Sequence, residues 1–355
     1  MGAPSMTFRH AGPFAVVLKR RVAAALKRPS TFDRRRRLHM KSVVMLAWFL
    51  ASYVWLVFVA SVWWEVVLLM GSLVFAMAGL AFNVLHDGGH GAYSRRPFVN
   101  RIMAMALDLL GGSSFTWKWK HNVLHHTYPN VLGVDSDVDL WPYGRVSSGQ
   151  PRYGIHRFQH WYMWVLYGFV PVNWYISDFR FLVSGRIRER RFPRPRRTDL
   201  VVFISWKIVF VAWAILVPLR YHAPAQVLAV WLVCSFALGL ALAIPFQLAH
   251  CVLEVQAVAP PTVERLEWAV HQVRTTANFA TSNRLLTWYL GGLNFQIEHH
   301  LFPSVSHIHY PHLSPIVRAV CDEFHVRYVA HDTIGAAIRS HCRWLRRLGR
   351  IPQES

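Results

Sequence analysis

Long apolar stretches constrain what this 355-residue chain can fold into. Residues 42–85 contain one charged side chain, Glu65, and two further stretches run from Leu200 to Pro218 and from Gln226 to Leu248. About 20 apolar residues in a helix cross the hydrocarbon core of a bilayer, so residues 42–85 are long enough for two spans. We therefore predict an all-α integral membrane protein with four transmembrane helices in two hairpins.

Positive charge indicates how these spans are oriented. Arg34–Arg37 and Lys41 precede the first span, and seven arginines within residues 186–197 precede the third. Lys and Arg concentrate on the cytoplasmic side of membrane proteins, so we expect both termini and the loop between the hairpins to face the cytosol. The excess of 39 Lys and Arg over 18 Asp and Glu is then charge at the membrane surface. A nucleic-acid partner is excluded, because a basic DNA-binding domain would not contain such long uncharged stretches.

The spans divide the chain into three parts. Residues 1–41 form a basic cytosolic segment, residues 42–330 the membrane domain, and residues 331–355 a basic C-terminal tail. Two other apolar segments, Ile102–Leu110 and Trp161–Leu182, are short or interrupted by polar residues. This pattern is typical of segments that lie at the membrane interface rather than spans.

Histidines are concentrated just beyond the spans, on the side expected to be cytosolic. Seven of the 20 histidines form three groups: His86 and His90, then His121, His125 and His126, then His299 and His300. Residues four apart share one face of a helix, so His121 and His125 can converge on one site while His126 points about 100° away. Adjacent histidines such as His299 and His300 can therefore serve two metal ions in a cytosolic helical cap.

The ligand type indicates a transition metal. Neutral imidazole suits iron, copper, nickel or zinc, whereas magnesium and calcium prefer oxygen ligands. Seven or more nitrogens exceed what one ion can hold, so we expect two ions.

The three groups stand in motifs that resemble the histidine boxes of the membrane fatty acid desaturases. The motifs read His86-Asp-Gly-Gly-His90, His121-Asn-Val-Leu-His125-His126 and Gln296-Ile-Glu-His299-His300. Gln296 replaces the first histidine of the third box, which is similar to the front-end subgroup. That subgroup includes linoleoyl-CoA-type and other Δ5 and Δ6 enzymes, and it acts between an existing double bond and the carboxyl end. The likeness covers roughly residues 40–330.

The resemblance implies two Fe²⁺ ions with O₂ as co-substrate. As ligands it implies the seven box histidines together with His250, which matches a family histidine near the end of the last span. Three further side chains are candidates, namely Gln247, His271 and Gln296. Because carboxylates commonly orient metal-bound imidazoles, a set of acidic residues is considered for that role: Asp87, Asp135, Asp137, Asp139 and Glu298.

The resemblance also implies the reaction, the insertion of a cis double bond into an acyl chain linked to CoA, acyl carrier protein or a membrane lipid. An apolar tunnel would present the chain to the irons. Five aromatic residues are candidates for its wall, although we expect at least half of them to belong to the aromatic belt at the membrane interface instead: Trp117, Trp119, Trp141, Trp288 and Tyr289. Lys118, Lys120 and Arg152 are candidates to meet a CoA or lipid phosphate. Many front-end relatives carry a fused cytochrome b5 domain with a His-Pro-Gly-Gly motif that this sequence lacks. We therefore expect a separate electron donor, a ferredoxin or a cytochrome b5 with its reductase.

Two other functions fit parts of the pattern. Membrane fatty acid hydroxylases and other monooxygenases use similar di-iron boxes and form an alcohol instead of a double bond. A metal transporter is a more distant alternative, since its histidines would line a path through the spans. Soluble di-iron carboxylate proteins are excluded because they need Glu-x-x-His pairs, and no such pair occurs in this sequence.

Overall fold

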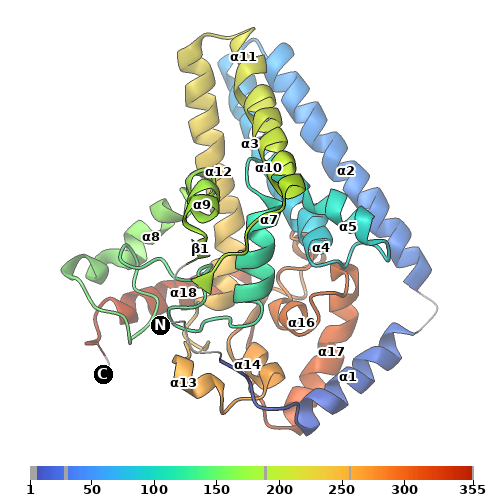
Figure 1. Cartoon of the computed structure of the whole chain (residues 1–355), viewed down its shortest axis with the longest axis vertical. Coiled ribbons are helices and arrows are strands. Elements are labelled where there is room, and N and C mark those ends of the chain that lie inside the picture. The colour runs from blue at the N-terminus through green and yellow to red at the C-terminus, as the bar shows by residue number, and fades with distance from the viewer. Residues whose placement is uncertain (1–5, 28–30, 188–189, 256, 354–355) are drawn as a thin grey trace.

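The computed structural model describes residues 6–27, 31–187, 190–255 and 257–353, and these residues are mostly helical (Figure 1). Four helical segments are long and apolar enough to cross a membrane: Arg36–Phe58, Trp63–Gly89, Arg197–Leu219 and Pro224–His250. Many of their side chains face outward, including Leu68 and Ile208, each 64% exposed. Apolar surface of this kind is favourable against lipid and unfavourable against water. The prediction of four spans in an all-α membrane protein is confirmed, while the pairing into two hairpins stays a prediction.

The spanning segments are built from several consecutive helices. They are α2 (Thr31–Phe58), α3 (Trp63–Leu80) with η1 (Ala81–Leu85) and α4 (His86–Gly89), α10 (Arg197–Val211) with η4 (Ala212–Leu216) and α11 (Val217–Leu219), and α12 (Pro224–His250). Both α2 and α12 pack against α3. The helix that leads into the first histidine box therefore lies at the centre of the bundle.

The remaining elements gather mainly at one end of the spans and form a cap (Figure 1). The helices before α10 are α1 (Pro13–Leu26), α5 (Pro97–Ala104), α6 (Ala106–Leu109), α7 (Ser114–Trp117), η2 (Lys118–His125), η3 (Gly154–Phe158), α8 (Gln159–Tyr167) and α9 (Val170–Ser184). Those after α12 are α13 (Pro260–Val263), α14 (Trp268–Arg274), α15 (Arg284–Tyr289), α16 (Gln296–Leu301), η5 (His307–His309), α17 (Tyr310–Glu323) and α18 (Ile334–Leu348). Two small sheets complete it: antiparallel β1 (Arg186–Ile187) and β2 (Arg190–Arg191), and parallel β3 (Asn278–Phe279) and β4 (Ala330–His331).

The segments expected outside the spans are all folded onto this body. The stretch expected as a basic tail contains α18, which packs against α8 and α12 and buries Trp344 and Leu345. The apolar segment 161–182 forms α8 and α9, which expose Trp161 and Val183. Their place at the membrane interface and the three-part division of the chain stay predictions.

A tight contact joins the end of α3 to the loop before the third histidine box. Gly291 has a φ of +58°, and a Cβ there would lie 2.2 Å from the Phe82 carbonyl oxygen. Only glycine fits, because it has no Cβ and adopts positive φ readily. The amide of Asn83 also donates to the carbonyl of Tyr289 at 2.9 Å. These contacts hold the approach to the third box against the helix that carries the first.

A buried ion pair connects the third span to the cap. Lys207 of α10 donates to Asp178 of α9 at 2.8 Å and to the carbonyls of Gly111 and Gly112 at 2.6 and 3.2 Å. The hydroxyl of Thr116 donates to the same carboxylate. A charged group inside a span needs protein partners of this kind, because lipid tails offer none. The pair therefore fixes α10 relative to α9 and to the turn before α7.

Replacing Lys207 with Ala should strongly destabilise the fold. The variant leaves the Asp178 carboxylate and two carbonyls buried without their cation, and breaking a buried pair costs about 3–5 kcal/mol. Thermal unfolding in detergent, followed by tryptophan fluorescence, should show a clear fall in Tm. The double variant Lys207→Met with Asp178→Asn should lose less stability than Lys207→Ala, because it removes both charges; an equal or larger loss would contradict the importance of the pair.

Candidate metal centre

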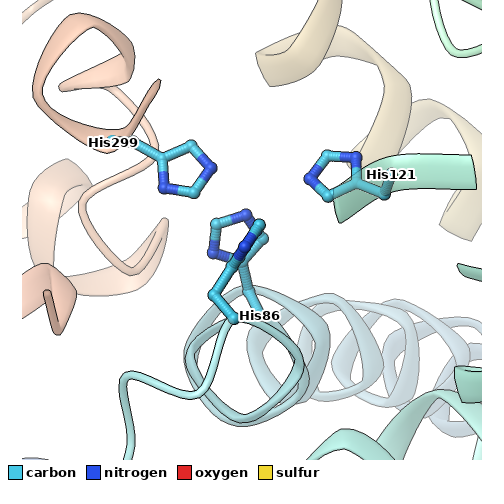
Figure 2. Close-up of side chains that lie close together, drawn as sticks. His86, His121 and His299 are labelled. Atoms are coloured by element: carbon cyan, nitrogen blue, oxygen red, sulfur yellow. The ribbon is translucent and has the colours of Figure 1, made fainter. Parts of the chain in front are cut away.

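Eight histidines converge at the junction between the spans and the cap. They form three groups, and within each group one ring nitrogen of every histidine lies within 4.8 Å of those of the others. The groups are His86, His90, His121 and His299; His125, His250 and His300; and His126, His299 and His300. All eight residues predicted as ligands belong to these groups. Figure 2 shows the rings of His86, His121 and His299 turned toward one another from three separate elements.

The second box is divided between the groups, which differs from the α-helical expectation. His121 lies with the first box, whereas His125 lies with His250 and His300. The segment that carries them, η2, is a π-helix, and the amide of His126 donates to the carbonyl of His121, five residues back. The rings of His121 and His125 still stack, with centroids 5.0 Å apart, and the wider turn of a π-helix places residues five apart one above the other. His126 is thereby brought to 3.2 Å from His121 between their Nε2 atoms.

The third box serves both groups, as its adjacent histidines predicted. His299 lies with His86, His90 and His121, and its ring centroid is 4.3 Å from that of His86. His300 lies with His125 and His250, with centroids 4.9 and 4.8 Å away. Residues from two spans and two cap segments therefore meet at one place.

Several inward-facing nitrogens in the cluster lack a hydrogen-bond partner among the described residues. These buried atoms are Nε2 of His90, His125, His250 and His300, and Nδ1 of His126. A buried polar atom without a partner is unfavourable, so such atoms usually mark an ion, a water or a ligand. The arrangement fits a metal centre.

Two aspartates hold the outer nitrogens of the second box. His125 Nδ1 donates to Asp135 at 2.9 Å, and His121 Nδ1 donates to Asp137 at 2.8 Å. Lys120 pairs with Asp137 at 2.9 Å. A hydrogen bond of this kind fixes the tautomer and the ring orientation, and it leaves Nε2 free for a metal.

Burial keeps most of these imidazoles neutral, which is the form that binds metals. Removal from water, together with neighbouring histidines, lowers the pKa of His126, His299 and His300 well below 6.5. For His125 burial also lowers the pKa, but the charge and hydrogen bond of Asp135 outweigh it and raise the pKa above its usual value. Asp135 therefore makes His125 the most electron-rich ligand of its group, since an anionic acceptor raises ligand basicity.

The sequence did not single out the partners that hold the other outer nitrogens. His300 Nδ1 donates to Gln272 at 3.0 Å, and His250 Nδ1 donates to the carbonyl of Thr275 at 3.3 Å. His299 Nδ1 forms a 3.1 Å hydrogen bond with the Tyr310 hydroxyl. Of these partners, only Gln272 could have been found from the sequence, because it stands next to His271, which was already a ligand candidate.

The other acidic candidates have different partners. Asp87 contacts His307 at 3.0 Å and accepts from Ser306, so it joins the first box to the loop before η5. Glu298 accepts from Asn278 and Tyr328, both at 2.8 Å. Burial raises the pKa of Glu298 to about 7, against the effect of these hydrogen bonds. Asp139 accepts from the Trp141 backbone amide rather than from a cluster imidazole.

The three additional ligand candidates take different positions. Gln247 and Gln296 line the cavity beside the cluster, and the Oε1 atom of each is buried without a partner among the described residues. His271 is buried but belongs to none of the three groups, and its ring packs 5.1 Å from Phe8.

An apolar cavity of about 250 Å³ reaches the cluster. Its wall includes His86, His121, His125 and His299, together with apolar side chains from the spans and from α8 and α9, among them Leu85, Leu166, Val170, Trp174, Leu242 and Phe246. Of the five aromatic candidates for the wall, Trp117 lines the cavity and stacks on His121 with ring centroids 4.5 Å apart, whereas the other four are not among its lining residues. The cavity offers an apolar surface next to the cluster.

The fatty acid desaturase family model matches residues 61–332, which contain all eight histidines. The chain belongs to the fatty acid desaturase family. This membership agrees with the resemblance seen in the three histidine boxes and with the four apolar helices.

The chain is similar to curated desaturases over nearly its whole length. It is 36% identical to an "sn-1 linoleoyl-lipid 6-desaturase" of Synechocystis over 98% of this chain and 99% of that one. A protein of the same description from Arthrospira platensis is 34% identical, with 98% and 96% covered. An "Acyl-lipid (8-3)-desaturase" of Physcomitrium patens is 35% identical over 95% of this chain and 72% of its own length.

Fatty acid desaturases are generally di-iron enzymes that use O₂, and the donor set here fits that cofactor. Imidazole nitrogen is a suitable ligand for iron. Two neighbouring groups of imidazole nitrogens fit two ions better than one.

Replacing His125 or His300 with Ala should reduce bound iron and abolish activity, because each change removes a ligand of the same group. Iron should be measured by inductively coupled plasma mass spectrometry on purified protein. The control His160→Ala changes a histidine outside the three groups and should keep the wild-type iron content. Full iron occupancy in both cluster variants would refute the assignment.

Replacing Asp135 with Asn should weaken iron binding about 10- to 100-fold without removing a ligand, since loss of such a hydrogen-bond partner typically has that effect. Iron retention during titration with a chelator measures it. Asp322→Asn, at an exposed position, is the matched control. Equal retention in the Asp135 and Asp322 variants would count against a role of Asp135 in holding His125.

Proposed function

We propose that this chain is a di-iron, O₂-dependent front-end desaturase that inserts a cis double bond into the acyl chain of a membrane lipid. The observation that carries the proposal is the convergence of eight histidines beside an apolar cavity, in a chain of the desaturase family. It acts as an oxidoreductase on a fatty acyl substrate.

The imidazoles divide into two sets of ligands. His86, His90, His121 and His299 would hold one iron, and His125, His250 and His300 would hold the other, with His126 against both sets. The unpaired oxygen of Gln247 would accept a hydrogen bond from a ligand water, and that of Gln296 would coordinate weakly or orient a neighbouring ligand. Two ferrous ions bound here supply, with O₂ and two electrons, the oxidising power that amino-acid side chains lack.

The remaining work of the protein is positioning. The apolar cavity removes the chain from water and presents one methylene to the irons, and a misplacement of ~1 Å can lower the rate about a hundredfold. Trp117 lines this cavity beside the first and second boxes, since its ring is 4.5 Å from that of His121 and 5.3 Å from that of His90. Trp117 therefore limits where the chain passes the imidazoles.

The carrier and the position of the bond follow from the relatives. Two relatives covered almost completely are described as linoleoyl-lipid 6-desaturases, and others as acyl-lipid desaturases. We transfer the lipid carrier and the front-end position to this chain. The glutamine that begins the third box supports the same subgroup.

The electron donor is a separate cytosolic protein, a ferredoxin or a cytochrome b5 with its reductase. The arginines and lysines that flank the spans on the cap side favour a cytosolic cap under the positive-inside rule. The histidine cluster then lies on the cytosolic face, where soluble donors can reach it.

Expression in a host supplied with Δ9-unsaturated fatty acids should yield a new cis double bond between C9 and the carboxyl end. Gas chromatography with mass spectrometry of fatty acid derivatives locates the bond. The His300→Ala variant is the negative control. A bond toward the methyl end would refute the front-end assignment, and a hydroxylated product would favour the hydroxylase alternative.

A further inference from the structure

A second, larger pocket of about 980 Å³ is also lined by Trp117. We call it the basic pocket, because five cationic side chains line it: Arg95, Arg101, Lys118, Arg194 and Arg196. They come from the loop before α5, from α5 itself, from η2 and from the segment that leads into α10. Residues distant in the sequence thus bring positive charge to one place.

This charge is only partly neutralised by the two carboxylates in the wall. Asp199 pairs with Arg101 at 3.2 Å and accepts from the Arg196 amide at 3.1 Å. Asp108 is buried and accepts from the Ser114 amide at 3.1 Å. Burial raises the pKa of Asp108 to about 6, despite its hydrogen bonds with Ser114.

Three cations of the basic pocket remain without a carboxylate partner. Among the described residues, Arg95, Lys118 and Arg194 form no ion pair, and all three are exposed. A pocket with unpaired cations on several sides fits an anionic group, because arginine in particular binds phosphate through several hydrogen bonds.

The basic pocket lies at the depth of lipid head groups. Its wall includes Val202 and Phe203 from the first turns of the spanning helix α10, while Arg194 and Arg196 precede that helix. The neighbouring α5 exposes Phe98 to 73%, as expected for a helix against the membrane interface. In Figure 1, α5 lies beside the spans where they enter the cap.

The basic pocket and the apolar cavity share two wall residues, Ser113 and Trp117. A Cβ at Gly89 would lie 2.2 Å from the Trp117 ring, so glycine in the first box lets the indole lie against the helix end. The indole therefore stacks on an imidazole of the cluster and also lines the basic pocket. A molecule with an anionic head and an apolar chain could occupy both.

We propose that the basic pocket binds the phosphate of an anionic glycerolipid whose acyl chain passes Trp117 into the apolar cavity. This proposal rests on the proposed function and specifies its substrate class. An extended chain advances about 1.2 Å per bond, so C6 of an sn-1 acyl chain lies about 6 Å from its ester carbonyl carbon and, counted through the glycerol, about 13 Å from the phosphorus. A phosphate held in the pocket that shares Trp117 with the apolar cavity therefore leaves only a short length of acyl chain before the imidazoles, which is what a bond near the carboxyl end requires.

The experiment measures lipid binding to the iron-loaded protein in neutral detergent by microscale thermophoresis. The ligands are phosphatidylglycerol, diacylglycerol and inorganic phosphate, and the variant is R95Q/K118Q/R194Q. Because each cation near an anionic head group contributes about fivefold, the variant should bind phosphatidylglycerol about a hundredfold more weakly. Its binding of diacylglycerol and its iron content should match those of the wild type.

The matched control is K19Q/R20Q/R274Q, which removes three exposed charges from α1 and α14 at the far end of the cap (Figure 1). This control should keep the wild-type affinity for phosphatidylglycerol. Equal affinities of both triple variants would overturn the proposal. Wild-type binding of inorganic phosphate as tight as that of phosphatidylglycerol would also overturn it, since the site would then take free phosphate.

Turnover distinguishes failure of this site from failure of the proposed function. With a linoleoyl phosphatidylglycerol substrate, R95Q/K118Q/R194Q should raise KM and largely keep kcat, because it changes binding and leaves the imidazoles in place. An unchanged KM would refute the basic pocket as the head-group site. A wild-type enzyme that forms no double bond from any acyl lipid would instead refute the proposed function.

Discussion

Buried imidazole nitrogens need a partner, and this structure gathers eight histidines where water is largely excluded. Each ring has two nitrogens. The outer nitrogen of several rings is satisfied by protein, through Asp135, Asp137, Gln272 and Tyr310. Several inner nitrogens are left without a partner among the described residues. A cluster built in this way is stable when cations fill its centre, and the surrounding fold is organised to keep the rings in place.

Two features of the backbone keep them there. The π-helix η1 precedes the first box, and the π-helix η2 carries the second. Both change the direction of successive side chains relative to an α-helix. Asn83 and Gly291 then hold the approach to the third box against η1. The cluster therefore depends on packing between the central span and the cap, and on the Lys207–Asp178 pair that fixes the third span beside it.

Two pockets meet at Trp117. One is lined by imidazoles and many apolar side chains, and the other is lined by five cationic side chains. An amphipathic lipid combines the same two chemistries in one molecule, with a charged head and an apolar chain. The shared wall thus places the proposed head-group site next to the cavity that reaches the imidazoles.

The sequence by itself determined the four spans, because the thickness of a bilayer requires long apolar runs that are visible without a structure. It also determined the family and seven of the eight histidines, since the three boxes are local motifs, and the resemblance to the family added His250. Only the tertiary structure decided how these residues meet. His121 and His125 fall into two groups, and Gln272 rather than its neighbour His271 contacts the cluster. The stretch expected as a basic tail contains the helix α18. The physical reason is that spacing predicts which side chains share a face of a regular helix, whereas contacts such as that of His125 with His250 depend on how segments far apart in the chain pack together.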